Sequence, residues 1–208
     1  MIQFSLFGIP VRVEPMFWLT CSFLGGIFYA RTSEALLLVA LFVIAAFVSV
    51  LIHEMGHALM IRKFRQPTAV TLSAFGGYAT YPAGVLTRKK SFLVTAAGPA
   101  IQIAFGLGVL FLAPFISLES SHLDSFVTYL VWVSIIWAVF NCLPIYPLDG
   151  GQMLAAVLGP RRAKALHVTG MVCAGLVGLY ALTSGFMLMG IFMGMFTWQN
   201  YQMLQQHR

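Results

Sequence analysis

The stretch L-I-H-E-M-G-H-A-L-M, residues 51–60, places two histidines and a glutamate in a segment that is otherwise almost entirely apolar. The apolar segment starts at Ala35 and contains no Lys, Arg, Asp or Glu before Glu54. About 20 apolar residues in a helix are enough to cross the hydrocarbon core of a bilayer. Ionisable groups at that depth are costly, and where they occur they usually serve a function. The stretch therefore predicts a membrane-spanning helix that carries a functional site.

Composition places the whole chain in the class of membrane proteins. Of its 208 residues, 60% are hydrophobic and only 9% are charged, and the mean hydropathy is +0.88. Soluble domains carry about 25% charged residues. The N-terminal sequence lacks the basic start and the small-residue cleavage site of a signal peptide, so we expect the first span to be retained. We predict an all-α polytopic membrane protein that forms a single domain over residues 1–208.

Six apolar segments are candidates for the membrane-spanning helices, each of which needs about 17–25 residues. They cover residues 16–30, 35–61, 91–115, 126–143, 166–182 and 185–201. The first segment is short, and the second is long enough to tilt or to protrude from the bilayer. The last two are separated only by a tight turn, which indicates a helical hairpin. The pattern predicts six transmembrane helices.

The distribution of Lys and Arg predicts the orientation of these helices. With the N-terminus inside, eleven of the 12 Lys and Arg residues fall on one side of the membrane, and only Arg31 falls on the other. Basic residues concentrate in cytoplasmic loops. We therefore expect both termini in the cytoplasm and a location in the inner or plasma membrane of a bacterium. The net charge of +6 is explained by this asymmetry, and we expect no nucleic-acid partner.

Residues 66–82 do not read as a span. Pro67 and Pro82 bracket a segment in which residues alternate in the manner of a strand, and Gly76-Gly77 then supplies a turn. The pattern predicts a short β-hairpin after the second helix, re-entrant or at the cytoplasmic interface, and an ordinary surface hairpin is the alternative. The N-terminal residues 4–13 could pair with it as a further strand.

The spacing of the two histidines points to a metal site. His53 and His57 are four residues apart, so on a helix both imidazoles lie on the same face and can reach one Zn²⁺. Glu54 is rotated by about 100° from His53, beside the metal without being forced to bind it. That is the arrangement of a metal-activated water with a neighbouring general base. The alternative is that both histidines are core polar groups satisfied by neighbouring helices.

A catalytic zinc site needs a third protein ligand, with water in the fourth position. The best candidate is Asp149, in N-C-L-P-I-Y-P-L-D-G-G at residues 141–151. It follows the fourth span at its cytoplasmic end, the depth at which the topology also puts His53 and His57. The other histidines and carboxylates fall in loops, in the tail or on the opposite side. The alternative for Asp149 is a helix N-cap, opening a helix at Gly150.

These two motifs, His53 to His57 and Asn141 to Gly150, resemble those of the site-2 protease family of intramembrane zinc metalloproteases. Ala97-Gly98-Pro99 is also similar to the family's small-residue packing motif. The short form with six spans is most similar to the sporulation-type branch, but without the CBS domain of some relatives. The resemblance covers about residues 10–200.

The resemblance implies hydrolysis of a peptide bond within or near the cytoplasmic half of a transmembrane substrate helix, in regulated intramembrane proteolysis, with one zinc ion per chain. The residues that match the family's zinc ligands are His53, His57 and Asp149, and Glu54 matches its general base. Asn141 matches an Asn that orients substrate or supports the oxyanion. The residues that match its substrate-contacting hairpin are Phe75, Gly76, Gly77 and Tyr78. Many relatives carry an Asn where this chain has Gln102, to which we assign no role.

The implied partners are the lipid bilayer and a single-span membrane protein as substrate, for example a membrane-tethered transcription regulator. A regulatory membrane protein or a second copy of the chain are further candidates. The rival function is a transporter in which the same ionisable groups line a pathway. A pathway should place polar groups through both leaflets, whereas here they gather at one end. A catalytically inactive scaffold is disfavoured because Glu54 and all three candidate ligands are intact.

Overall fold

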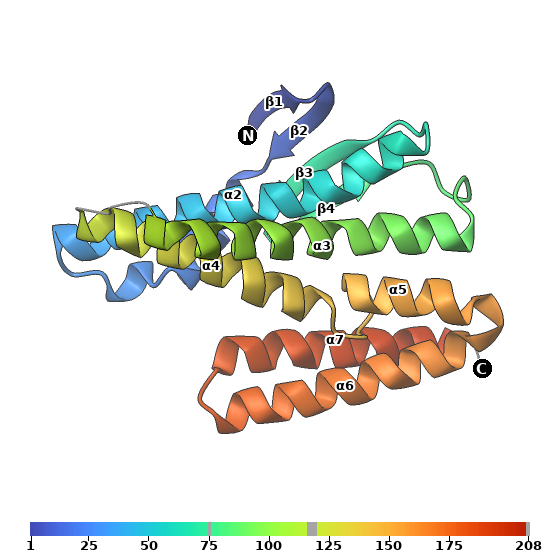
Figure 1. Ribbon diagram of the computed structural model, residues 1–208. Coiled ribbons are helices and arrows are strands. Elements are labelled where there is room, and N and C mark those ends of the chain that lie inside the picture. Colours follow the sequence, from blue (N-terminus) through green and yellow to red (C-terminus); the bar gives the residue numbers. More distant parts are fainter. Residues whose placement is uncertain (75, 116–119, 207–208) are drawn as a thin grey trace. The chain divides into compact units, whose positions relative to one another are not determined.

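The computed structural model describes residues 1–74, 76–115 and 120–206 (Figure 1). The chain divides into two compact units. Unit 1 comprises Met1–Val85 and Ala97–Val139, and unit 2 comprises Leu86–Ala96 and Phe140–Arg208. Helix α3 (Arg88–Leu112) begins in unit 2 and continues into unit 1. The prediction of a single domain stays a prediction.

A four-stranded sheet lies in unit 1, in the order β1-β2-β3-β4. The strands are β1 (Ile2–Leu6), β2 (Ile9–Val13), β3 (Ala69–Ser73) and β4 (Gly76–Thr80). β1 pairs antiparallel with β2, and β3 pairs antiparallel with β4. The two hairpins are joined by a parallel pairing of β2 with β3, in which Val11 lies opposite Val70. The prediction that the N-terminal segment adds a strand to the hairpin is confirmed. Gly76 and Gly77, expected in the turn, are instead the first residues of β4.

Alternation along the strands builds the core of unit 1. In β2 the side chains of Ile9, Val11 and Val13 are buried while Arg12 is exposed, the period-2 pattern of a sheet with one buried face. That face packs against two helices, α1 (Pro15–Leu24) and α2 (Ser33–Lys63). The further buried residues of this core are Phe17, Cys21, Ala46, Val50, Met55, Ala58, Val70 and Leu72. The sheet therefore covers the half of α2 that carries the histidines.

The long helix α2 has 31 residues and clear signals at both ends. The hydroxyl of Thr32 accepts a hydrogen bond from the backbone N–H of Ala35 at 3.1 Å and caps the first turn. Glu34 lies in the first turn, and Arg62 and Lys63 lie in the last, the signs that the helix dipole favours. Unit 1 is completed by part of α3 and by most of α4 (Ser121–Asn141).

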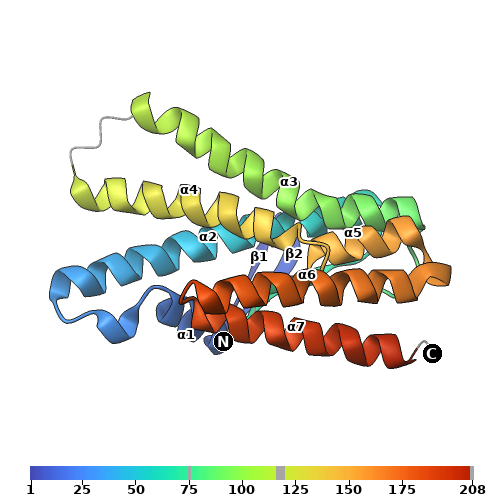
Figure 2. The ribbon, with the colours of Figure 1, turned by 90° about the horizontal axis from the view of Figure 1, so that it is seen from below.

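Unit 2 consists mainly of helices α5 (Asp149–Leu158), α6 (Ala163–Thr183) and α7 (Met187–Gln206). α6 and α7 run side by side as a hairpin, which Figures 1 and 2 show from two directions. Gly178 lets them approach, because a Cβ there would lie 2.9 Å from the Cβ of Met193. Ile145, Ala174 and Met193 form the buried centre of the unit.

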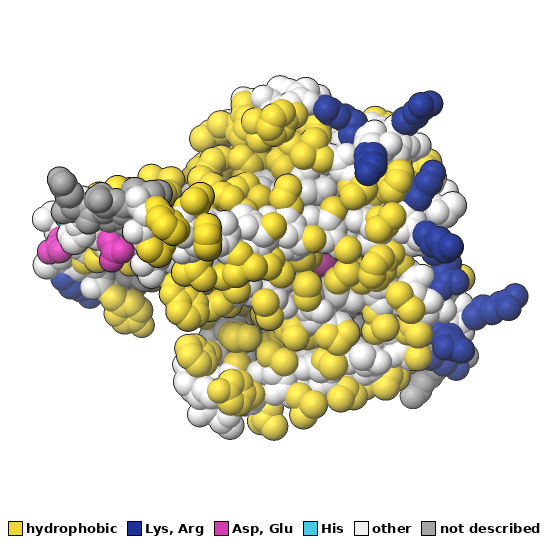
Figure 3. Space-filling model, viewed as in Figure 1, with side chains coloured by type: hydrophobic (Ala, Val, Ile, Leu, Met, Phe, Trp, Pro, Cys, Tyr) yellow, Lys and Arg dark blue, Asp and Glu magenta, His cyan; other side chains and the backbone are white. Residues whose placement is uncertain are grey.

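Four helices among the described residues are long and apolar enough to cross a membrane, and they support an integral membrane protein. They are Ser33–Lys63, Arg88–Phe115, Ser121–Asn141 and Pro160–Thr183. Large apolar side chains such as Phe111, Trp132 and Leu176 are more than half exposed on these helices, and Figure 3 shows hydrophobic side chains over much of the visible surface. The count of six spans stays a prediction: α1 has only ten residues, and α7 is not among the four.

Candidate metal centre

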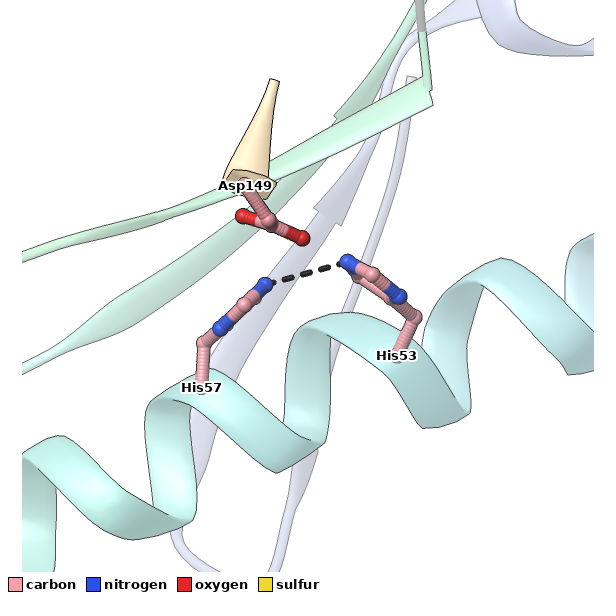
Figure 4. Close-up of side chains that lie close together, drawn as sticks. All are labelled: His53, His57 and Asp149. Atoms are coloured by element: carbon pink, nitrogen blue, oxygen red, sulfur yellow. Dashed lines mark hydrogen bonds between the residues drawn. The ribbon is translucent and has the colours of Figure 1, made fainter. Parts of the chain in front are cut away.

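The centre of the candidate site is the pair of histidines on α2. His53 and His57 are both buried, and their Nε2 atoms lie 3.0 Å apart. Their rings meet edge to face, with the centroids 4.7 Å apart, and Figure 4 shows both side chains pointing toward the same space. The four-residue spacing therefore produces the convergence that the sequence predicts.

This geometry fits a zinc ion. Zinc–nitrogen bonds of about 2.0–2.1 Å at a tetrahedral angle place two ring nitrogens about 3.3 Å apart. The observed separation of the Nε2 atoms is 3.0 Å, so a shift of a few tenths of an ångström would admit the metal. Two imidazole nitrogens of unit 1 are therefore available to one metal ion.

Close packing of α3 against α2 holds the pair in place. A Cβ at Gly56 would lie 2.6 Å from the backbone oxygen of Ala97, and a Cβ at Gly98 would clash with the imidazole of His57. Real Cβ atoms do not approach so closely, so both positions require glycine. The segment Ala97-Gly98-Pro99 thus brings the backbone of α3 directly onto the imidazole of His57.

The sheet positions Glu54. Its side chain is buried, and it packs on the backbone of β4, where a Cβ at Gly77 would lie 2.5 Å from the Cγ of Glu54. Gly76, at a φ of +111°, is in a conformation that only glycine adopts readily, and the ring of Trp137 faces it. The two glycines therefore bring the start of β4 against the carboxylate side chain. Tyr78, further along β4, is half-exposed.

Gln102 is a partner of the site that sequence reasoning left without a role. It lies on α3, fully buried, and its Oε1 is 2.7 Å from the Nδ1 of His53. Its Nε2 donates to the hydroxyl of Ser49 at 2.8 Å. The available signal was a primary amide within an apolar helix, a costly residue at membrane depth.

Asp149 lies in unit 2, as the first residue of α5, and it is buried. The residue at the N-cap is Leu148, so the N-cap alternative for Asp149 is wrong. Gly150 and Gly151 allow α5 to begin against the preceding loop: a Cβ on Gly150 would clash with the backbone of Cys142, and one on Gly151 with that of Tyr146.

The remaining predicted residues are placed as follows. Asn141 is the last residue of α4 and is half-buried. Phe75 lies outside the described residues. Gly76, Gly77 and Tyr78 lie together at the start of β4.

Comparison with known proteins extends this picture. The family described as peptidase family M50 matches residues 116–184. Rip3 of Mycobacterium tuberculosis is 31% identical over 165 residues, which cover 72% of this chain and 41% of Rip3. A zinc metalloprotease of Methanocaldococcus jannaschii is 26% identical over 159 residues, or 76% of this chain and 45% of the relative. Stage IV sporulation protein FB of Bacillus subtilis is 30% identical over 148 residues, or 70% and 46%.

The chain thus spans less than half the length of these curated relatives. Its fold is that of the solved structure of the site-2 protease from Methanocaldococcus jannaschii, with a TM-score of 0.70, 22% identity, and coverage of 98% of this chain and 94% of that one. The particular branch expected from the sequence stays a prediction. Taken together, the family match, the relatives and the fold show that the chain is similar to peptidase family M50, the site-2 protease family.

Proposed function

We propose that the chain is a zinc metallopeptidase that hydrolyses a peptide bond within or near the cytoplasmic half of a membrane-embedded protein substrate. The observation that carries this proposal is the buried His-Glu-x-x-His segment of α2, in which His53 and His57 bring two ring nitrogens together and Glu54 is also buried. The match of residues 116–184 to peptidase family M50 supports it.

The proposed metal ligands are His53, His57 and Asp149, which bind one zinc ion per chain. Two imidazole nitrogens and a carboxylate oxygen are a donor set typical of catalytic zinc, which keeps its fourth position open for water or substrate. Magnesium and calcium are disfavoured because they prefer all-oxygen sites. The buried position of Asp149 at the start of α5 is in keeping with a ligand, because a carboxylate away from water needs a partner of opposite charge.

When bound, zinc lowers the pKa of a coordinated water and polarises the scissile carbonyl. The proton transfers fall to Glu54, whose carboxylate takes a proton from the attacking water and then gives it to the amine of the leaving peptide. The backbone of β4 at Gly77 lies against the side chain of Glu54 and limits the space in which its carboxylate can move. The proposed role of Asn141 is to orient the substrate or to support the negative charge that develops on the carbonyl oxygen.

The proposed docking site for the scissile segment is the open edge of β4. β4 is the last strand of the sheet, so an extended segment can add to it by backbone hydrogen bonds. Such a strand would run close to Glu54, because Glu54 packs on Gly77. The residues proposed to contact it are Phe75, Gly76, Gly77 and Tyr78. A helical substrate must first unwind, which favours Gly, Pro or Asn near the cut.

An apolar cavity of about 260 Å³ in unit 1 supports a membrane segment as substrate. It is lined by side chains of α1, α2 and α4 and by the hairpin. Its lining residues on α2 are Phe42, Ala46 and Val50, four residues apart, and Glu54 continues the same spacing. Neighbours at this spacing lie one turn apart on the same side of a helix, so Glu54 lies next to Val50 along α2. The proposed occupant is therefore a large apolar side chain of the bound segment.

The proposed setting is a bacterial inner or plasma membrane, with six spans and both termini in the cytoplasm. The proposed substrate is a single-span protein, such as a membrane-tethered transcription regulator released by regulated intramembrane proteolysis. A regulatory membrane protein or a second copy of the chain are the proposed further partners.

The test is cleavage of single-span proteins co-expressed with the full chain. The unchanged chain should cut at least one of them, and Glu54→Gln should leave zinc bound and remove cleavage. Glu34→Gln is the matched control, because Glu34 is an exposed carboxylate at the other end of α2. Equal cleavage by the unchanged chain and Glu54→Gln would exclude the proposed mechanism. Ion flux in vesicles that depends on Glu54, without cleavage, would favour the transporter.

A further inference from the structure

We propose that Gln102 is a positioning residue that fixes the tautomer of His53, so that the Nε2 of His53 presents its lone pair to the metal. Ser49 and Ser134 hold the Gln102 amide in the orientation that this requires. The inference rests on the proposed zinc site, but it concerns the ring proton of His53 and can be tested in the metal-free chain.

The first observation is the contact between the ring and the amide. The Nδ1 of His53 lies 2.7 Å from the Oε1 of Gln102, and both residues are buried in unit 1. A neutral imidazole has one N–H and one nitrogen with a lone pair, and its partner decides which nitrogen keeps the proton. If the amide presents its oxygen, Nδ1 must donate, and Nε2 is left with the lone pair.

The second observation decides which way the amide faces. The Nε2 of Gln102 lies 2.8 Å from the hydroxyl of Ser49 and 3.4 Å from its backbone oxygen. A carbonyl oxygen only accepts hydrogen bonds, so the amide must turn its N–H₂ group toward Ser49. Turning the amide over would set two acceptors against each other at Ser49. The oxygen of Gln102 therefore faces His53.

The third observation is that the arrangement extends across three helices. Ser134, on α4, donates its hydroxyl to the hydroxyl oxygen of Ser49 at 2.9 Å, and Gln102 donates to the same oxygen. Ser49, Gln102 and Ser134 are all fully buried. In a bilayer, water cannot replace such hydrogen bonds, so a buried polar chain holds its orientation firmly. One chain of hydrogen bonds thus links α4, α2 and α3 to the ring of His53.

The expected effect is on metal affinity. Partners that orient a metal-binding histidine typically contribute about 10–100-fold to metal affinity. Gln102→Met keeps the length of the side chain and removes both hydrogen bonds, so it should weaken zinc binding by about that factor. Gln102→Glu keeps an oxygen acceptor for Nδ1 and should restore most of the affinity. Ser134→Ala removes only the outermost link and should have a smaller effect.

The experiment uses the full chain purified in detergent and stripped of metal. The tautomer of His53 is read from the ¹⁵N shifts of histidine-labelled protein, assigned with His53→Gln. Zinc affinity is measured by competition with a chelator, and the site is also examined through the absorption of bound Co²⁺. Gln202→Met, an exposed amide on α7, is the matched control and should change none of these.

In the unchanged chain, the proton of His53 should be on Nδ1, and Gln102→Met should lose that preference together with zinc affinity. If Gln102→Glu recovers both the proton on Nδ1 and the zinc affinity, the effect of Gln102→Met comes from the lost hydrogen bond to His53 and not from altered packing. The proposal is overturned if the proton lies on Nε2 in the unchanged chain, or if Gln102→Met binds zinc and Co²⁺ as the unchanged chain does. If Gln102→Met fails to fold, the tautomer in the unchanged chain and the response to Ser134→Ala decide the question. The ring proton is read without peptidase activity, so failure of the proposed function would be a separate result.

Discussion

The Nδ2 of Asn200 donates a hydrogen bond to the carbonyl oxygen of Tyr146 at 2.6 Å. Asn200 is fully buried on α7, and its Oδ1 lies 3.2 Å from the Nδ1 of His167 on α6. Gly170 provides the room, because a Cβ there would lie 2.6 Å from the Oδ1 of Asn200. The helical hairpin of unit 2 therefore anchors the loop that ends at Asp149.

We expect Asn200→Leu to loosen this loop. It leaves the Tyr146 carbonyl without this donor, and an unsatisfied buried group costs about 1–3 kcal/mol. The midpoint of thermal unfolding should fall, and zinc affinity should fall with it if Asp149 is a ligand. Gln202→Leu, exposed on the same helix, is the control. If the variant is clearly destabilised but its zinc affinity is unchanged, the loop that ends at Asp149 does not contribute to metal binding.

Gly98→Ala should displace the imidazole of His57. The added methyl group would occupy space that the imidazole ring fills. The backbone of α3 is closely packed and cannot easily move away from the ring. We expect the zinc content of the purified protein to fall severalfold. Gly108→Ala on the same helix meets open space and should keep its zinc. Full zinc occupancy in Gly98→Ala would show that the imidazole of His57 can move aside and still bind the metal.

Gly77→Ala should impair turnover without removing the metal. Its Cβ would lie 2.5 Å from the Cγ of Glu54, so the carboxylate must move away from its position over β4. Zinc content should stay near that of the unchanged chain, because the three atoms nearest to an added Cβ at Gly77 all belong to Glu54, which is not a proposed metal ligand. The measurements are cleavage of a co-expressed substrate and metal content, with Gly108→Ala again as control. Wild-type cleavage by Gly77→Ala would argue against Glu54 as the base.

Filling the apolar cavity should change which substrates are cut. Ala46→Leu places extra volume on the cavity wall that continues toward Glu54. Discrimination by an apolar pocket is worth about 1–3 kcal/mol per methylene, or about 10–200-fold in rate. Cleavage of a substrate with Leu or Phe near the cut should fall by about that factor relative to one with Ala. Ile44→Leu, on the exposed side of α2, is the control and should leave the ratio of the two cleavage rates unchanged. If Ala46→Leu slows the cleavage of both substrates equally, the cavity is not a pocket for a substrate side chain.

Single cysteines should report the orientation of the chain in the membrane. In a background without the three native cysteines, a cysteine at position 89 or 164 should react with an impermeant thiol reagent only from the cytoplasmic side. A cysteine at position 120 should react only from outside. Reaction of all three positions from one side would contradict the predicted number of spans.

Local patterns made much of unit 1 predictable. The spacing of His53, Glu54 and His57 sets their directions on a helix, and this needs no knowledge of the rest of the chain. The alternation of residues within the 66–82 segment likewise indicated strands, and residues 4–13 were a candidate for a further strand. The exact turn was not predictable, because Gly76 serves both as a strand residue and as a point of close approach to Trp137.

The role of Gln102 could not be predicted, because it depends on how two helices align. Its hydrogen bond to His53 joins residues 49 positions apart, and a rotation of α3 by one residue would turn the amide away. The pattern of apolar residues fixes such alignments only loosely. The glycines that set it, Gly56 and Gly98, have no side chain, so their partners appear only in three dimensions.

The parallel pairing of β2 with β3 has a consequence for biosynthesis. β2 leaves the ribosome before α1 and α2, yet its partner β3 follows only after both helices have been made. Until then the β1–β2 hairpin is a two-stranded unit, which is marginally stable in water on its own. Closing the sheet must join segments separated by two membrane-inserting helices, and such distant pairings form slowly. Strand β2 must therefore wait, unpaired on one side, while α2 is inserted.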